Sequence, residues 1–180
     1  MKRKILEEIN IPEGINCEIT HEGLKVSMGG NSLLKEIDKP GIKIHVKDGK
    51  IIIECKGAHR EDNAFIKSLA AHLSNIFNGL HKPFVYELEI CNVHFHMTAK
   101  VEGSKLIISN FLGEKEKRTA NVLENVKVDI KGQKITVSSS DKAAAGQTAA
   151  NIEKATKITK RDRRVFQDGV FITSKPGESI

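Results

Sequence analysis

The chain has 180 residues, of which 39% are hydrophobic. Its 29 Lys and Arg residues outnumber its 23 Asp and Glu residues, so the formal net charge is +6 and the pI is near 9.2. This length provides for one or two packed domains, and the composition excludes a disordered chain because it holds only four prolines and no long Ser- or Gly-rich tract. No apolar run approaches the length that spans a bilayer and the N-terminus has no apolar signal core, so we expect a soluble protein without a membrane contact.

Cysteine usage indicates a reducing compartment. Cys17, Cys55 and Cys91 are odd in number, widely spaced and form no CxxC pair, so we interpret them as free thiols. Nucleic acid is the commonest polyanion that a basic protein meets inside the cell. Charge and cysteine content together favour a partner of that kind.

The first half of the chain predicts two β-hairpins followed by a helix. Residues 17–28 alternate polar and apolar on either side of Gly23. Residues 42–54 do the same around Gly49, which suits a tight turn because glycine accepts a positive φ. Apolar residues then recur at three- and four-residue spacing over residues 65–80, which indicates a helix facing a core.

The second half repeats this order. Two hairpins are predicted at residues 95–109 and 126–138, each turning at a glycine. A helix follows over residues 143–152, with Asp141 as its N-cap. Its packing residues are mostly alanines, so we expect it to lie close to its sheet.

The repeat predicts an α+β fold of two tandem similar modules, each an antiparallel β-sheet covered by one α-helix. We place the modules at residues 1–82 and 83–173, with Pro83 at the boundary, and treat residues 174–180 as a C-terminal tail. A duplication allows one copy to hold position while the other makes the specific contact.

Most of the excess charge lies in one stretch, residues 154–164. It has six cations and a single acid, Asp162, for a net charge of +5 in a chain of +6. Concentrated positive charge attracts phosphate polymers because binding releases their condensed counterions. Solvated polar surfaces usually mix both signs of charge, so the stretch predicts contact with nucleic acid.

Three segments resemble one protein family, in the family's order. Residues 11–15 (IPEGI) are similar to its opening strand, residues 110–115 (NFLGEK) match a loop that follows a hairpin, and residues 162–172 (DRRVFQDGVFI) resemble its tail. The chain therefore resembles the large-subunit ribosomal proteins of the L-six family, in their archaeal and eukaryotic form, over nearly its whole length.

This resemblance implies a structural constituent of the large ribosomal subunit, not an enzyme, that resides in the cytoplasm as part of the ribosome. It implies binding to large-subunit (23S-type) rRNA, mainly through the second module and the basic C-terminal segment, near the stalk base and the sarcin–ricin region. The expected partners are large-subunit rRNA and neighbouring ribosomal proteins. We expect no cofactor, no metal and no small-molecule substrate.

The second module holds most candidate RNA contacts. Lys115, Lys117 and Arg118 occupy a loop where the first module has the nearly uncharged residues 31–34, which favours the second module as the binding half. Arginine can grip a phosphate with two bonds, whereas lysines at the end of the second helix also favour the helix terminus. Phe166 and Phe171 bracket Gly169. Either one of them stacks on a base or anchors the tail beside RNA, or both pack against the second sheet as a last strand, which we favour. The candidate RNA-binding residues are Lys115, Lys117, Arg118, Lys154, Lys157, Lys160, Arg161, Arg163, Arg164, Phe166, Gly169 and Lys175.

Other classes of function have less support. His94 and His96 share one face of a predicted strand, but Cys91 has the opposite parity and no fourth ligand stands at a zinc spacing, so we expect partly exposed strand histidines. No spacing typical of a hydrolase or a phosphate-binding loop occurs. A protein–protein adaptor that uses the first module remains compatible with RNA binding. Nuclease treatment distinguishes the two, because it releases the protein from its complex only if RNA is the main tether.

Overall fold

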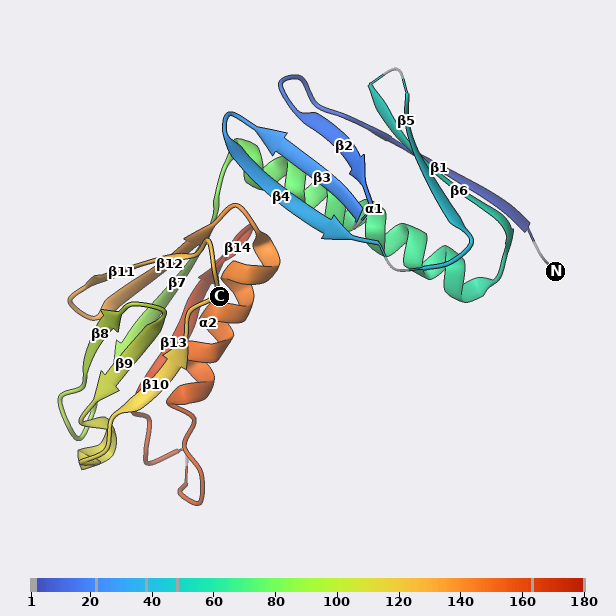
Figure 1. Ribbon diagram of the computed structural model, residues 1–180. Coiled ribbons are helices and arrows are strands. Elements are labelled where there is room, and N and C mark those ends of the chain that lie inside the picture. Colours follow the sequence, from blue (N-terminus) through green and yellow to red (C-terminus); the bar gives the residue numbers. More distant parts are fainter. Residues whose placement is uncertain (1–2, 22, 38, 48, 163, 180) are drawn as a thin grey trace. The chain divides into compact units, whose positions relative to one another are not determined.

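The chain folds as two compact units, Met1–Lys82 and Pro83–Ile180 (Figure 1). The structure is a computed structural model that describes residues 3–21, 23–37, 39–47, 49–162 and 164–179. Each unit combines antiparallel strands with one long helix. This arrangement confirms the α+β class and the duplication that the sequence predicts.

The first unit contains two antiparallel sheets and helix α1 (Arg60–His81). Its sheets have the strand orders β1-β6-β5 and β2-β3-β4. The core between them includes Leu24, Ile53 and, from α1, Leu73, all fully buried. The strands are β1 (Arg3–Asn10), β2 (Asn16–Thr20), β3 (Gly23–Met28), β4 (Asn31–Glu36), β5 (Ile42–Lys47) and β6 (Lys50–Ala58).

The second unit repeats this plan and adds to it. Its sheets have the strand orders β10-β9-β8 and β11-β12-β7-β13-β14, and helix α2 (Lys142–Ala155) packs with both. Leu88, Leu106, Ile135 and Ile152 are fully buried in its core. The other elements are β7 (Phe84–Cys91), β8 (Thr98–Glu102), β9 (Lys105–Ser109), the short 3₁₀ helix η1 (Phe111–Gly113), β10 (Arg118–Asn121), β11 (Lys127–Lys131), β12 (Lys134–Ser139), β13 (Gly169–Lys175) and β14 (Glu178–Ser179).

The two units correspond strand by strand, and the differences correct three details of the prediction. Each unit has two sheets instead of one. The predicted tail boundary at residue 174 falls inside β13, which pairs with β7 and continues to β14. Residues 11–15 form a turn between β1 and β2 instead of a strand, with Ile15 N–H donating to the Pro12 carbonyl.

Helix α2 begins where the sequence predicts and lies close to its sheet. The Asp141 carboxylate accepts a hydrogen bond from the Ala143 N–H at 2.8 Å, as expected for an N-cap. Ala145 and Ala149 are fully buried. A methyl group at Gly146 would come within 2.9 Å of the Tyr86 hydroxyl oxygen, so the helix approaches the sheet too closely for a larger side chain.

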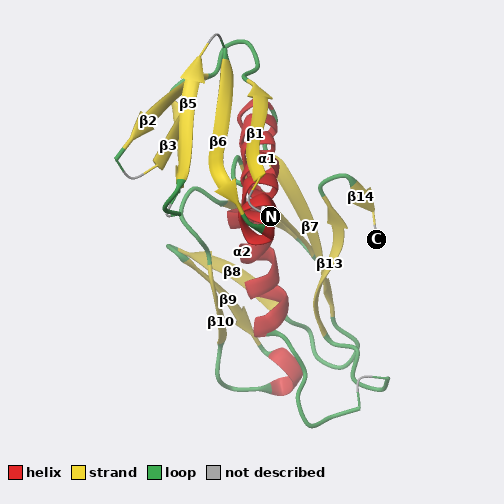
Figure 2. Cartoon of the chain, turned by 90° about the vertical axis from the view of Figure 1, so that its right-hand side faces the viewer, coloured by secondary structure: helices red, strands yellow, loops and turns green. Residues whose placement is uncertain are grey.

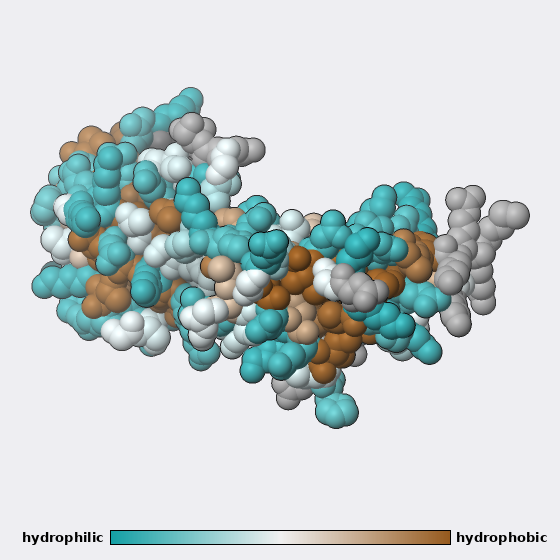
Figure 3. Space-filling model, turned by 90° about the horizontal axis from the view of Figure 1, so that it is seen from above, coloured by the Kyte–Doolittle hydropathy of each residue, from teal (hydrophilic) through white to brown (hydrophobic). Residues whose placement is uncertain are grey.

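The first unit exposes apolar surface among its polar residues (Figure 3). Its most exposed large apolar side chains are Leu6, Ile19 and Leu34. No helix in the described ranges is long and apolar enough to cross a membrane.

Candidate nucleic-acid interface

Three connecting segments of the second unit meet at one end of its sheets, as Figures 1 and 2 show. They are residues 92–97 between β7 and β8, residues 110–117 between β9 and β10, and residues 156–168 between α2 and β13. We call these segments, together with Lys154 in the last turn of α2, the loop end. Hydrogen bonds join all three, so the side chains they carry form one surface.

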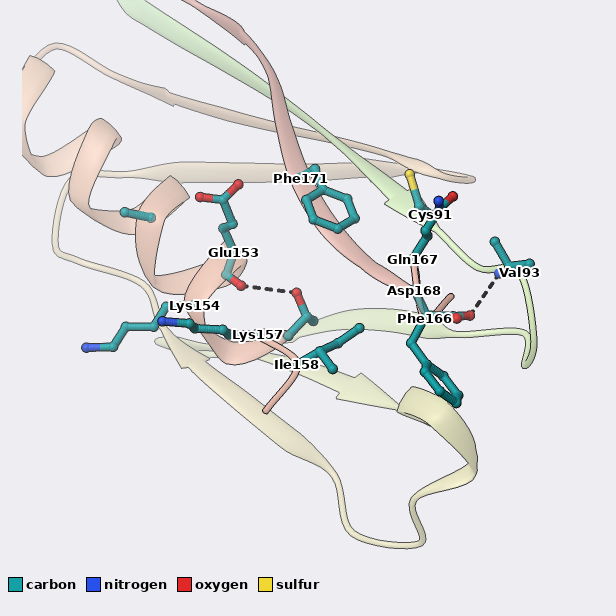
Figure 4. Close-up of a pocket in the computed structure, with 12 residues that line it drawn as sticks. Cys91, Val93, Glu153, Lys154, Lys157, Ile158, Phe166, Gln167, Asp168 and Phe171 are labelled. Atoms are coloured by element: carbon teal, nitrogen blue, oxygen red, sulfur yellow. Dashed lines mark hydrogen bonds between the residues drawn. The ribbon is translucent and has the colours of Figure 1, made fainter. Parts of the chain in front are cut away.

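The buried carboxylate of Asp168 ties residues 156–168 to residues 92–97. Asp168 Oδ1 accepts hydrogen bonds from the Val93 N–H at 2.8 Å and the His94 N–H at 2.9 Å, and its Oδ2 lies 2.6 Å from His94 Nδ1. Burial alone would raise the pKa of Asp168, but the hydrogen bonds from His94 and Val93 outweigh this effect and lower the pKa below its usual value. The carboxylate therefore stays ionised and acts as a fixed acceptor (Figure 4).

This arrangement corrects the prediction for the histidines. β7 ends at Cys91, so His94 and His96 belong to a loop and not to a strand. His94 binds Asp168, and the His96 carbonyl accepts a hydrogen bond from Asn110 Nδ2 at 2.9 Å. Within the described part of the chain, no three His, Cys, Asp or Glu side chains are grouped as metal ligands.

The half-buried ring of Phe166 stacks on another side chain of the protein. This ring lies 5.2 Å from the His94 ring, centroid to centroid, at an interplanar angle of 28°. The Arg161 guanidinium lies 4.9 Å from the centroid of the same phenyl ring, a cation–π distance. Phe171, in contrast, belongs to strand β13. Packing against the second sheet as a last strand thus describes Phe171, whereas Phe166 braces two loops.

Arg118 braces the third segment. Its guanidinium forms a bidentate pair with Glu114, Nε to Oε2 at 2.8 Å and Nη2 to Oε1 at 2.7 Å. Nη1 donates to the Ala155 carbonyl at 3.0 Å and, at 3.3 Å, to the Lys157 carbonyl. The Arg118 guanidinium also lies 4.1 Å from the centroid of the Phe111 ring.

These bonds change the role predicted for Arg118. Carbonyls at a helix C-terminus lack partners within the helix, and Arg118 supplies donors to carbonyls there while it holds residues 110–117 beside α2. Its four hydrogen bonds are made within the protein, so Arg118 braces the fold, and an RNA contact of this residue stays a prediction. The hydrogen bond from Arg118 lowers the pKa of Glu114 below its usual value.

Five lysines at the loop end are exposed. Lys115 and Lys117 project from residues 110–117, and Lys154, Lys157 and Lys160 from the end of α2 and beyond. A groove of about 940 Å³, whose lining includes Lys154 and Lys157, separates α2 from β13 and the adjoining loop (Figure 4).

Four other candidates have different positions. Arg164 is 90% exposed and binds Asp162 with Nη2 at 2.9 Å, and Arg163 lies outside the described residues. Gly169 is buried, and a methyl group there would come within 3.1 Å of Phe171 Cζ, so this residue serves packing. Lys175 is exposed at the opposite end of β13, so the structure does not bring it to the loop end.

Exposed cations on a braced backbone suit the binding of a polyanion. RNA helices are recognised mostly through shape, phosphates and 2′-hydroxyls, and such recognition requires positioned donors.

Comparison with known proteins points to one family. The family model described as Ribosomal protein L6 matches residues 97–169, a range that includes two of the three loop-end segments. Large ribosomal subunit protein uL6 from Methanococcus vannielii is 40% identical over 176 residues, which cover 98% of this chain and 97% of that protein.

Proposed function

The chain belongs to the ribosomal protein L6 family, in its archaeal form, and we propose that it holds large-subunit rRNA with the loop end of its second unit. As a member of this family it is a structural constituent of the large ribosomal subunit and not an enzyme. It works in the cytoplasm, where ribosomes translate.

One observation carries the proposal. Exposed lysines at positions 115, 117, 154, 157 and 160 stand on two segments that Arg118 fastens together. Because the backbone that carries these lysines is already ordered, binding costs side-chain freedom but little backbone freedom. Where two rRNA segments approach each other, these lysines would neutralise phosphates and lower the electrostatic cost of the junction.

The proposal includes a location. The resemblance of residues 110–115 and 162–172 to the family's loop and tail supports a position near the stalk base and the sarcin–ricin region. Mapped crosslinks from the loop end to rRNA in intact ribosomes are the measurement that decides this point; crosslinks confined to distant rRNA would exclude it.

Charge neutralisation tests the RNA contact better than truncation, because removing residues 153–180 also removes β13, which pairs with β7. We expect the double variant Lys154→Gln, Lys157→Gln to weaken binding of the full chain to archaeal large-subunit rRNA in a filter-binding titration. The slope of log K against log salt should flatten by roughly 0.7 to 0.9 per lost phosphate contact.

The matched control is the double variant Lys43→Gln, Lys47→Gln, which makes the same change of charge on two exposed lysines of β5 in the first unit. It should change neither the affinity nor the slope. Equal losses from both double variants would refute the assignment of the contact to the loop end, and undiminished binding by the first would refute the proposed function.

A further inference from the structure

The loop end exposes apolar side chains among its cations. Val93 is 67% exposed, Phe95 49% and Val165 60%. Single exposed aliphatic residues are common on protein surfaces and need no explanation. A half-exposed phenyl ring is less usual because burying it stabilises a fold by about 2 kcal/mol, so Phe95 is the informative member of this group.

The backbone on both sides of Phe95 is fixed. Asp168 receives the N–H groups of Val93 and His94 at 2.8 and 2.9 Å. On the other side, the His96 carbonyl accepts from Asn110 Nδ2 at 2.9 Å. Phe95 therefore projects from an anchored loop, and its exposure is a property of the folded state.

A glycine sets the position of the ring itself. Gly113 has a φ of +76°, and a methyl group there would lie 3.4 Å from Phe95 Cζ and 3.5 Å from Cε2. The far end of the ring thus rests on η1, while about half of the residue still reaches solvent. Lys115, an exposed cation, lies two residues beyond Gly113 in the same segment.

An exposed aromatic ring held in position on a surface of net positive charge suits one ligand chemistry. Bases in an uninterrupted RNA duplex stack on one another and offer no free face, whereas unpaired bases stack on aromatic side chains while cations hold the neighbouring phosphates. We propose that Phe95 stacks on an unpaired nucleobase of the bound RNA. This inference rests on the proposed function and adds that the recognised RNA contains a bulge or an open loop.

The surrounding charge argues for RNA over a protein segment as the occupant. Residues 110–117 hold two lysines and two glutamates, but residues 156–168 hold five cations against Asp162 and the buried Asp168, and residues 92–97 hold no acid. The three segments together therefore carry a net positive charge, which attracts RNA phosphates.

The test compares the affinities of Phe95→Leu, Phe95→Ala, Phe95→Tyr and Phe95→Trp for archaeal large-subunit rRNA and for a fully paired RNA duplex. Stacking on one base predicts that Phe95→Ala weakens rRNA binding roughly 5- to 150-fold. Phe95→Leu keeps an apolar side chain but should also bind weakly, and the Tyr and Trp variants should bind several-fold more tightly than Phe95→Leu. The salt slope should stay constant across this series, because no cation is lost, and thermal unfolding of each variant verifies its fold.

The outcomes separate this inference from the proposed function. Wild-type affinity for all Phe95 variants, together with weak binding by the Lys154→Gln, Lys157→Gln variant, would overturn base stacking and leave the rRNA contact standing. Equal losses on rRNA and on the paired duplex would also overturn it. Normal RNA affinity combined with poor incorporation of Phe95→Ala into ribosomes would assign the ring to a neighbouring protein instead.

Discussion

Replacing Glu114 with glutamine removes a negative charge from the cationic loop end, and electrostatics alone would predict tighter RNA binding. The contacts of Glu114 predict the opposite sign. Its carboxylate holds the Arg118 guanidinium at 2.7 and 2.8 Å, in the orientation from which Arg118 reaches the Ala155 and Lys157 carbonyls. Loss of the carboxylate weakens the link between residues 110–117 and α2. The lysines of this segment are then held less firmly in place.

The magnitudes decide which effect prevails. The side chains of Arg118 and Glu114 are 27% and 40% exposed, so their bidentate pair contributes about 0.5 to 1 kcal/mol, in the upper part of the range for partly exposed pairs. Repulsion between Glu114 and an RNA phosphate is screened over about 8 Å at physiological salt and amounts to a few tenths of a kcal/mol. Bracing prevails, and we expect Glu114→Gln to bind rRNA about twofold more weakly.

Glu116 provides the matched control. It is an exposed acid of the same segment, and it takes part in none of the hydrogen bonds or ion pairs found among the described residues. Glu116→Gln should therefore show only the electrostatic effect and bind slightly more tightly. Filter binding of both variants at one salt concentration gives the comparison; tighter binding by both would refute the bracing role of the Glu114–Arg118 pair.

Two further predictions concern stability. Asp168→Asn should lower the free energy of unfolding by about 2 kcal/mol at neutral pH, because a charged acceptor of buried hydrogen bonds is lost. Since the folded-state pKa of Asp168 is lowered, the contribution of this carboxylate to stability is complete at neutral pH and disappears as the pH falls below about 4. In denaturant titrations at several pH values, the free energies of unfolding of wild type and Asp168→Asn should converge there. A difference that stays constant with pH would contradict the linkage. Gly146→Ala should destabilise by about 1 to 3 kcal/mol because its methyl group meets the Tyr86 hydroxyl, although helix propensity alone predicts a gain of up to about 1 kcal/mol. Thermal unfolding measures the sign, and Tyr86→Phe in the same chain should restore part of the loss.

Much of the fold was predictable because its signals are local. Alternation around Gly23 and Gly49 marks hairpins, and the apolar spacing of residues 65–80 marks α1. The alanines of residues 143–152 correctly predicted a helix close to its sheet. Pairing between distant strands has no such local signal. The sequence indicated a last strand of the second sheet near Phe171, but neither its pairing with β7 nor the division of each unit into two sheets was predicted.

The composition of the sequence identifies the cationic segment of the candidate site, but it does not show what each side chain contacts. A count of cations identifies residues 154–164 as attractive to phosphate, yet it does not distinguish an exposed Lys157 from an Arg118 whose donors are engaged within the protein. One signal was available, because Glu114 and Arg118 are opposite charges four residues apart. Asp168 and Phe95 were missed since their roles depend on a loop that starts once β7 ends at Cys91.

The pairing of β13 with β7 changes the physical nature of the basic segment. Residues 156–168 are tethered at both ends, by α2 on one side and by a strand within the five-stranded sheet on the other. A free C-terminal arm would lose most of its chain entropy on docking, whereas this closed segment has lost much of that entropy during folding. In the proposed complex, rRNA would meet a cationic segment whose ends the fold already holds, so docking would cost less chain entropy than docking of a disordered extension.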